Sequence, residues 1–327
     1  MKNKSTNPNK PDSVKPQMGK EVKEYHPNGN LQSVGFLLND EKDGFWEEYH
    51  ENGQLKCKGS YLNGEKDGVW EVYYINGQLL SKESYLNGEK DGVWEVYFHN
   101  GQLFFKGSYL NGYKNGVWED YHLINGHLKC KGSYLNGKET GVWEKYHENG
   151  QLWSKVSYLN GKWDGIWEWY YSNGQLREKG SYFNGKETGV WEVYLDNGQL
   201  YSKRSYLNGE RDGLHILYGK NNSVESIRTY SKGNLEGETL DYWDNGTLME
   251  KTYYSNWIKE GIYEKHSENG SLVVSGSYLN GKMNGMWRFN DSWNNLKPSG
   301  GYQNGKRVGL WEWYNGNGER VRTKMYN

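Results

Sequence analysis

The stretch SYLNGEKDGVWEVY occurs twice without a single change, at Ser60–Tyr73 and again at Ser84–Tyr97, 24 residues later. A glycine marks the same point of every further copy, and successive copies are separated by 24 residues except for one step of 25. These anchor glycines are Gly44, Gly68, Gly92, Gly116, Gly141, Gly165, Gly189, Gly213, Gly237, Gly261, Gly285 and Gly309. A fixed period of this length predicts an array in which each unit packs mainly against its neighbours.

Each repeat carries two strand signals and two turn signals. Between Gly68 and Asp91, the segments GVWEVYYI and QLLSKESYL are rich in β-branched and aromatic residues, which favour strands. Asn76-Gly77 predicts a type I′ hairpin turn, which needs positive φ at both residues, and residues 87–90 predict a four-residue turn. No stretch has helical periodicity. We therefore predict an all-β fold, an elongated and twisted antiparallel meander of about 26 short strands in about 12 hairpin repeats.

These turns also predict a register. They pair Tyr74 with Leu79 and Tyr85 with Gly92, and the 24-residue period then closes without a leftover residue. Because side chains alternate between the faces of a strand, one face carries a tryptophan ladder with a glycine between most neighbours, and the other carries Glu–Lys pairs. The ladder is Trp46, Trp70, Trp94, Trp118, Trp143, Trp167 and Trp191. The predicted pairs are Glu47/Lys58, Glu71/Lys82, Glu95/Lys106, Glu144/Lys155, Glu168/Lys179 and Glu192/Lys203.

The regularity of the repeats changes along the chain. Residues 20–212 are predicted to be regular repeats, and residues 213–327 degenerate repeats that end in an edge strand. His215 stands where a ladder tryptophan is expected. The last strand carries basic side chains, which protect an exposed edge from pairing with another chain; these are Arg320, Arg322 and Lys324. The polar, Lys-rich residues 1–19 are predicted to be a disordered leader.

Composition excludes several classes of function. With 40 basic and 41 acidic residues the formal charge is −1, so the chain has no charge excess that would recruit nucleic acid or an anionic membrane. No apolar run approaches the ~20 residues of a membrane-spanning helix, and the N-terminal segment lacks the apolar core of a signal peptide. Cys57 and Cys130 are predicted to be free thiols, which suits a reducing compartment. We expect a cytoplasmic protein.

The repeats provide no constellation for catalysis. An active site needs unlike groups that converge in one pocket, whereas an array offers the same group again and again. Glu71 and its equivalents are expected to be structural ion-pair partners. The eight histidines have no spacing typical of zinc ligands, and no phosphate-binding or dinucleotide fingerprint is present. We predict a protein that is not an enzyme and that uses neither metal nor cofactor.

Departures from the repeat indicate where binding would occur. Trp163 occupies a position, expected in a turn, where other repeats carry Lys, Glu or Arg, and Tyr113 stands one residue earlier in its own turn. The same region adds Trp153 and Trp169 to the ladder residues Trp143 and Trp167. Exposed Trp and Tyr are frequent anchors of protein interfaces, so these six residues are the candidate binding site. Packing against neighbouring strands is the alternative role, above all for the two ladder tryptophans.

The repeat resembles a known family. The pattern Tyr-x-Asn-Gly-Lys-x-x-Gly-x-Trp-x-x-Tyr-x-x-Asn-Gly-x-Leu, present as YLNGKETGVWEKYHENGQL at Tyr134–Leu152, is similar to the bacterial MORN-variant repeat. Proteins built from it are often grouped as the YwqK-like antitoxin family. The resemblance implies β-hairpin repeats in an elongated sheet, and an antitoxin or immunity protein that binds and neutralises a toxin. The eukaryotic MORN repeat is a more distant relative, and its proposed phospholipid binding does not suit this neutral, Arg-poor chain.

Two other functions stay open at this point. Choline- and glucan-binding repeats of cell surfaces also combine short hairpins with Trp, Tyr and Asn-Gly, and stacked aromatics suit sugar rings and quaternary ammonium groups. Those repeats are shorter, near 20 residues, and their proteins need export. A structural adaptor in a larger assembly is the third possibility. The sequence predicts a protein partner but no particular oligomeric state.

Overall fold

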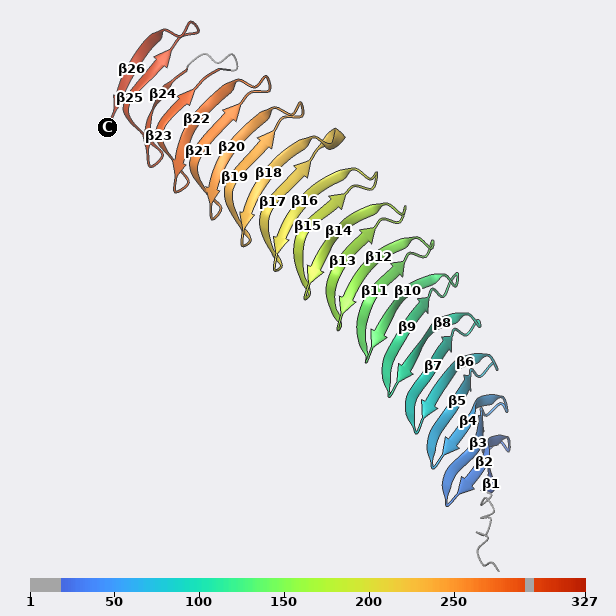
Figure 1. Cartoon of the computed structure of the whole chain (residues 1–327). Coiled ribbons are helices and arrows are strands. Elements are labelled where there is room, and N and C mark those ends of the chain that lie inside the picture. Colours follow the sequence, from blue (N-terminus) through green and yellow to red (C-terminus); the bar gives the residue numbers. More distant parts are fainter. Residues whose placement is uncertain (1–18, 292–296) are drawn as a thin grey trace, which may run out of the picture. The chain divides into compact units, whose positions relative to one another are not determined.

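The computed structural model describes residues 19–291 and 297–327. They form two compact units, one with the described chain up to Leu128 and Ser133–Lys138, the other with Lys129–Gly132 and the described chain from Glu139 on. Within each unit the strands lie side by side in the order of the chain (Figure 1). The predicted leader, residues 1–19, lies outside the described residues except for Gly19. Within these ranges, no helix is both long and apolar enough to cross a membrane.

The described residues consist almost entirely of strands. The first unit contains β1 (Lys20–Tyr25), β2 (Leu31–Leu38), β3 (Glu41–Tyr49), β4 (Leu55–Leu62), β5 (Glu65–Tyr73), β6 (Leu79–Leu86), β7 (Glu89–Tyr97), β8 (Leu103–Leu110) and β9 (Tyr113–Tyr121). The boundary between the units falls within β10 (Leu128–Leu135) and at the start of β11 (Lys138–Tyr146).

The second unit continues the same pattern. It contains β12 (Leu152–Leu159), β13 (Lys162–Tyr170), β14 (Leu176–Phe183), β15 (Lys186–Tyr194), β16 (Leu200–Leu207), β17 (Glu210–Tyr218), the 3₁₀ turn η1 (Lys220–Asn222), β18 (Val224–Ser231), β19 (Asn234–Tyr242), β20 (Leu248–Ser255), β21 (Ile258–His266), β22 (Leu272–Leu279), β23 (Lys282–Phe289), β24 (Ser299–Gln303), β25 (Lys306–Tyr314) and β26 (Arg320–Tyr326). In each unit, strands that follow one another pair antiparallel. The predicted all-β meander of hairpin repeats is therefore confirmed.

The first turn of each repeat differs from the prediction. The Gly77 N–H donates to the Tyr74 carbonyl, and only Gly77 of the pair Asn76-Gly77 has positive φ, at 82°. This is a type I turn followed by a left-handed glycine, not the predicted type I′ turn. It introduces a bulge, so that Tyr73 rather than Tyr74 pairs with Leu79. Asparagine is present for another reason, since the Asn76 Oδ1 accepts the Gln78 N–H at 3.0 Å.

The second turn is shorter than predicted. Asn87 and Gly88 both have positive φ, 48° and 81°, and Leu86 pairs with Glu89, so this is the two-residue type I′ turn. Tyr85 accordingly pairs with Lys90 rather than Gly92. The predicted loop was two residues too long. These two extra residues lie instead in a bulge of β7 around the anchor glycine Gly92, whose φ is 97°. The period of 24 residues is thus preserved by a different division between turn and strand.

The aromatic face follows the predicted ladder. Trp46, Trp70, Trp94, Trp118, Trp167 and Trp191 are buried, and so are Trp287 and Trp311 near the C-terminus. Each indole of a regular repeat lies over the glycine of the preceding strand. A Cβ added to Gly59 would be 2.3 Å from Cδ2 of Trp70, and one added to Gly107 would be 2.2 Å from Cδ2 of Trp118. The glycines therefore make the room that the tryptophans occupy.

The opposite face carries the glutamates and lysines in the predicted register, and Glu71/Lys82 and Glu192/Lys203 form ion pairs. All six predicted Glu–Lys pairs are cross-strand neighbours. Glu192 has a lysine on each side, Lys179 at 2.8 Å and Lys203 at 2.9 Å, and it accepts the Tyr194 hydroxyl at 2.6 Å. The same Tyr-to-Glu hydrogen bond recurs at Tyr49, Tyr73, Tyr97, Tyr121, Tyr146, Tyr170 and Tyr314.

Three of the degenerate repeats keep the strand pairing although His215, Thr239 and Tyr263 stand at the ladder position. His215 pairs with Arg204 on one side and Arg228 on the other. Burial lowers the pKa of His215 to about 4, helped by the nearby charges of Arg211, Arg204 and Arg228, so His215 is neutral at pH 7. Tyr230 and Leu235 become the buried apolar residues here.

We expect Gly107→Val to destabilise the first unit by about 1–3 kcal/mol, because the branched side chain would overlap the Trp118 indole. Equilibrium urea unfolding measures the difference. Gly316→Val is the matched control, since nothing lies within 4 Å of its added Cβ and Ile75 fills the same turn position in another repeat. Equal effects of both variants would contradict the indole-over-glycine contact.

A second expectation concerns pH. Hydrogen bonds from Lys179, Tyr194 and Lys203 lower the pKa of Glu192 to about 2. Because this value is below that of an unfolded chain, the stabilisation is complete above pH ~4.5 and is lost as the pH falls toward 2. Glu192→Gln should therefore reduce stability at pH 7 by about 1 kcal/mol or less, and the deficit should shrink through this window. Exposed Glu210→Gln is the control, and a deficit independent of pH would contradict the expectation.

Candidate functional site

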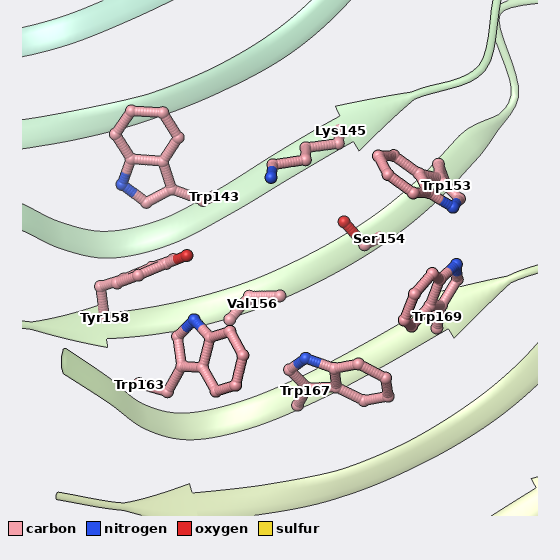
Figure 2. A pocket seen from close by; sticks show the side chains of 9 residues that line it. All are labelled: Trp143, Lys145, Trp153, Ser154, Val156, Tyr158, Trp163, Trp167 and Trp169. Atoms are coloured by element: carbon pink, nitrogen blue, oxygen red, sulfur yellow. The ribbon is translucent and has the colours of Figure 1, made fainter. Parts of the chain in front are cut away.

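Five of the six predicted site residues line one pocket of the second unit (Figure 2). We call it the tryptophan pocket. It is a cavity of about 250 Å³, and its lining comes from three adjacent strands. These residues are Trp143 and Lys145 on β11, Trp153, Ser154, Val156 and Tyr158 on β12, and Trp163, Trp167 and Trp169 on β13. Whether the pocket binds a partner remains a prediction at this point.

Tyr113, the sixth candidate, does not belong to this pocket. It is the first residue of β9 in the first unit, where it pairs with Leu110. Its side chain is 62% exposed. It follows the two-residue turn directly and lies beside Gly137, whose added Cβ would be 3.4 Å from the Tyr113 ring.

Trp163 lies on a strand rather than at a turn tip. It pairs with Tyr158 within the β12–β13 hairpin, and its ring centroid is 4.8 Å from that of Tyr182. In regular repeats a lysine at the same position stacks over a tryptophan and a tyrosine. The ammonium groups of Lys42, Lys66, Lys90 and Lys114 lie 4.1–4.3 Å from the tryptophan centroid and 4.9–5.0 Å from the tyrosine centroid. Trp163 replaces this cation with an indole that is 40% exposed.

Val156 is the cause of the cavity. It occupies the position at which regular repeats have the glycine beneath the next indole, here that of Trp167. In five glycine repeats the tryptophan ring contacts the tyrosine nine residues earlier at 4.9–5.2 Å. Trp167 instead packs at 5.2 Å against Trp191 and at 5.4 Å against Trp169. The branched side chain of Val156 prevents the usual position of the indole, and the space beside Tyr158 is left unfilled.

Position 83 shows that β-branching matters. Glu83 also replaces a glycine, yet Trp94 still contacts Tyr85 at 5.5 Å, tilted to 64° instead of nearly perpendicular. An unbranched side chain has one Cγ, which can turn away from the indole, whereas valine has two. A β-branched residue between two retained ladder tryptophans was the sequence signal for this cavity.

The remaining lining residues give the pocket two different ends. At one end Trp143 and Tyr158 meet edge to face at 6.2 Å. At the other, Trp153 meets Trp169 at 5.7 Å, and the Lys145 ammonium lies 5.9 Å from the Trp153 ring centroid. Lys145 is the one charged residue among the nine. Figure 2 shows its side chain on β11, between those of Trp143 and Trp153.

Sequence reasoning identified the tryptophans but missed Lys145, Ser154, Val156 and Tyr158. It placed Trp163 in a turn because it assigned four residues to that loop. The correct two-residue loop moves Trp163 onto the strand and its side chain over the neighbouring hairpin. The described part of the chain contains no group of three or more His, Cys, Asp or Glu side chains placed to hold a metal ion. The pocket offers aromatic surface, one ammonium group and one hydroxyl.

Eight segments of the chain match the model of a family described as "MORN repeat variant". They are residues 18–39, 42–63, 66–87, 90–111, 139–160, 163–184, 187–208 and 235–256, which together cover more than half of the chain. Two of them, 139–160 and 163–184, contribute every residue of the tryptophan pocket. No curated protein matches the chain.

Solved structures give only weak similarity. "Crystal Structure of TcdB2-TccC3-Cdc42" is 13% identical over 93% of this chain and 22% of that one, with a TM-score of 0.17. "Structure of Photorhabdus luminescens Tc holotoxin pore, Mutation TccC3-D651A" is 12% identical over 93% and 21%, with a TM-score of 0.16. The chain thus spans about a fifth of the length of these solved chains, and the low scores support no argument about function.

We expect Val156→Gly to close the tryptophan pocket. Without the branched side chain, the Trp167 indole should return to the position of the regular repeats, 4.9–5.2 Å from the ring of Tyr158. Its Nε1 should then donate to the Ser157 carbonyl, as Trp70 donates to Ser60 at 3.0 Å. A crystal structure of the variant measures both distances. Val156→Thr, which keeps the branching, should leave the pocket open. A Trp167 that stays against Trp191 in the glycine variant would contradict this account.

Proposed function

The chain belongs to the MORN repeat variant family, and from this premise we propose that its repeats are a non-catalytic scaffold that binds another protein through the tryptophan pocket. The single observation that carries the proposal is the pocket itself. Regular repeats fill their aromatic face from within, with an indole over the glycine and, in four of them, a lysine over the indole. The β12–β13 repeat omits both devices, with Val156 in place of the glycine and Trp163 in place of the lysine, and it leaves aromatic side chains open to a partner.

The exposure of the pocket residues supports an interface. Trp153 and Trp163 are 37% and 40% exposed, whereas Trp167 beneath them is 9% exposed. Tryptophans that are partly exposed above a buried floor are typical of the anchor residues of protein interfaces, where a few side chains supply most of the binding free energy. An isolated array does not need this arrangement for its own stability, since a lysine at position 163 would keep the repeat regular.

Within this proposal, the most specific function is that of an antitoxin or immunity protein. It rests on the resemblance of the repeat to the YwqK-like antitoxin family. Such a protein would hold its toxin in a stoichiometric complex and would act in the cytoplasm. The nearly balanced charge suits a protein partner better than nucleic acid.

The pocket also keeps one alternative open, a scaffold that binds cell-wall carbohydrate. Indoles stack on sugar rings as readily as on side chains, and the cavity is lined by five of them. The two functions differ in which molecule binds the full chain. An antitoxin retains one protein, whereas a carbohydrate-binding protein is retained by glycan without any protein partner.

We expect Trp163→Lys to weaken partner binding at least tenfold without loss of stability. The change restores the residue that stacks over the aromatic pair in four other repeats, so the thermal midpoint should stay within a few degrees. Affinity capture from the native cell with the full chain provides the partner, and titration calorimetry measures its affinity. Co-expression with the partner then shows whether the chain neutralises a toxin.

Tyr201→Lys is the matched control for this change. Tyr201 is 41% exposed on β16, outside the pocket, and Lys56 fills the same repeat position in the first unit. Tyr113→Glu tests the candidate in the first unit separately. If the partner's affinity is unchanged by both Trp163→Lys and Tyr113→Glu, these two residues do not belong to the interface. Retention on cell-wall glycan with no protein partner would favour the alternative function.

A further inference from the structure

We infer that the tryptophan pocket accepts one aromatic side chain of the partner protein, with a carboxylate beside it. This inference rests on the proposed function and adds the chemistry of the group that is recognised. The regular repeats show what the missing occupant is, because in them the equivalent space is filled by the chain's own indole.

The shape of the space comes from comparison with those repeats. In the repeat of Trp70, the indole lies over Gly59, contacts the Tyr61 ring at 4.9 Å and donates from Nε1 to the Ser60 carbonyl at 3.0 Å. Trp118, Trp287 and Trp311 make the same donation. In the β12–β13 repeat, Val156 displaces Trp167 toward Trp191. The Tyr158 ring then borders a cavity that is aromatic on its other sides.

The volume suits a single side chain. The cavity measures about 250 Å³, which is below the ~300–1,000 Å³ of sites for drug-sized ligands. A dry apolar cavity of ~150 Å³ is already large enough for benzene, so this one has room for a phenyl or indole ring. Walls of Trp143, Tyr158, Trp163 and Trp167 would meet such a ring at its edge and face, the geometries that aromatic pairs prefer.

The charge at the pocket indicates which residue stands beside the aromatic residue of the partner. Lys145 is the one charged lining residue, and among the described residues it forms no ion pair. Glu178, which pairs with Trp169 on the next strand, already lies 3.9 Å from Arg204. An ammonium group at the rim of an apolar cavity attracts a carboxylate and repels a cation. The occupant is therefore an aromatic residue next to Asp or Glu, not one next to Lys or Arg.

The test uses the full chain and small probes that imitate the side chains. Indole-3-acetate carries a ring and a carboxylate, tryptamine carries the same ring and an ammonium group, and acetate carries the charge alone. Titration followed by the NMR signals of the tryptophan Nε1–H groups measures each affinity. We expect indole-3-acetate to bind at least fivefold more tightly than tryptamine, and acetate not to bind. Lys145→Met should remove the preference for indole-3-acetate and keep a similar affinity for the ring.

Val156 gives a variant that discriminates sharply. Val156→Gly lets Trp167 fill the cavity, so the affinity for indole-3-acetate should fall at least tenfold. Because the variant restores the glycine of the regular repeats, loss of folding would not explain this fall. Tyr201→Lys lies outside the pocket and should bind indole-3-acetate within twofold of the original chain. Binding that survives Val156→Gly, no binding of indole-3-acetate to the original chain, or a preference for tryptamine would each overturn the inference.

The same variants separate this inference from the proposed function. If capture of the partner is lost with Trp163→Lys but not with Val156→Gly, the partner uses the exposed rim, so the function stands and the inference fails. If indole-3-acetate binds as expected but no protein partner is captured, the pocket chemistry is correct and the protein-binding function is overturned.

Discussion

The contact between an indole and the glycine of the preceding strand is the constraint on which the rest of this structure depends. A sheet one layer thick has no second layer to bury its apolar face. Here the tryptophan of most repeats lies over the bare backbone of a glycine and covers it, and in four repeats a lysine stacks over the indole in turn. The aromatic face thereby acquires a covering made from the side chains of neighbouring repeats alone. Each repeat consequently requires the next one, which explains why residues 60–73 and 84–97 can be identical.

The same constraint explains how a regular array acquires a distinct site. In such an array no position differs from its equivalents unless a side chain interferes with the common packing. Val156 does so by occupying the place of a glycine, and Trp163 does so by replacing the cation above the ring. The two changes fall in one hairpin, and together they turn a filled surface into a cavity of about 250 Å³. The pocket is produced by removing two structural contacts, with the strands and turns left as they are.

The ion-pair face has a different role. A Tyr-to-Glu hydrogen bond recurs along the regular repeats, and lysines on both sides keep the Glu192 carboxylate ionised. Exposed pairs of this kind add little stability individually. Their effect is on register, because a shift by one residue would move every side chain of a strand to the other face relative to its neighbour. This face fixes the alignment that the aromatic face needs.

The sequence alone determined the period, the strands, the Trp–Gly ladder and all six Glu–Lys pairs, because each follows from spacing and from the alternation of side chains along a strand. It also singled out the five tryptophans of the pocket, because Trp153, Trp163 and Trp169 depart from the repeat beside the ladder residues Trp143 and Trp167. It did not determine where the positive φ angles fall, since Asn-Gly suits both turn types and only the hydrogen bonds of the paired strands select one. Val156 between two ladder tryptophans was visible in the sequence, but the cavity that it leaves and the part of Lys145, Ser154 and Tyr158 in it were not. Whether a ladder indole fits over the residue of the preceding strand depends on whether that residue has a Cγ in its way. This is decided only when the strands are packed together.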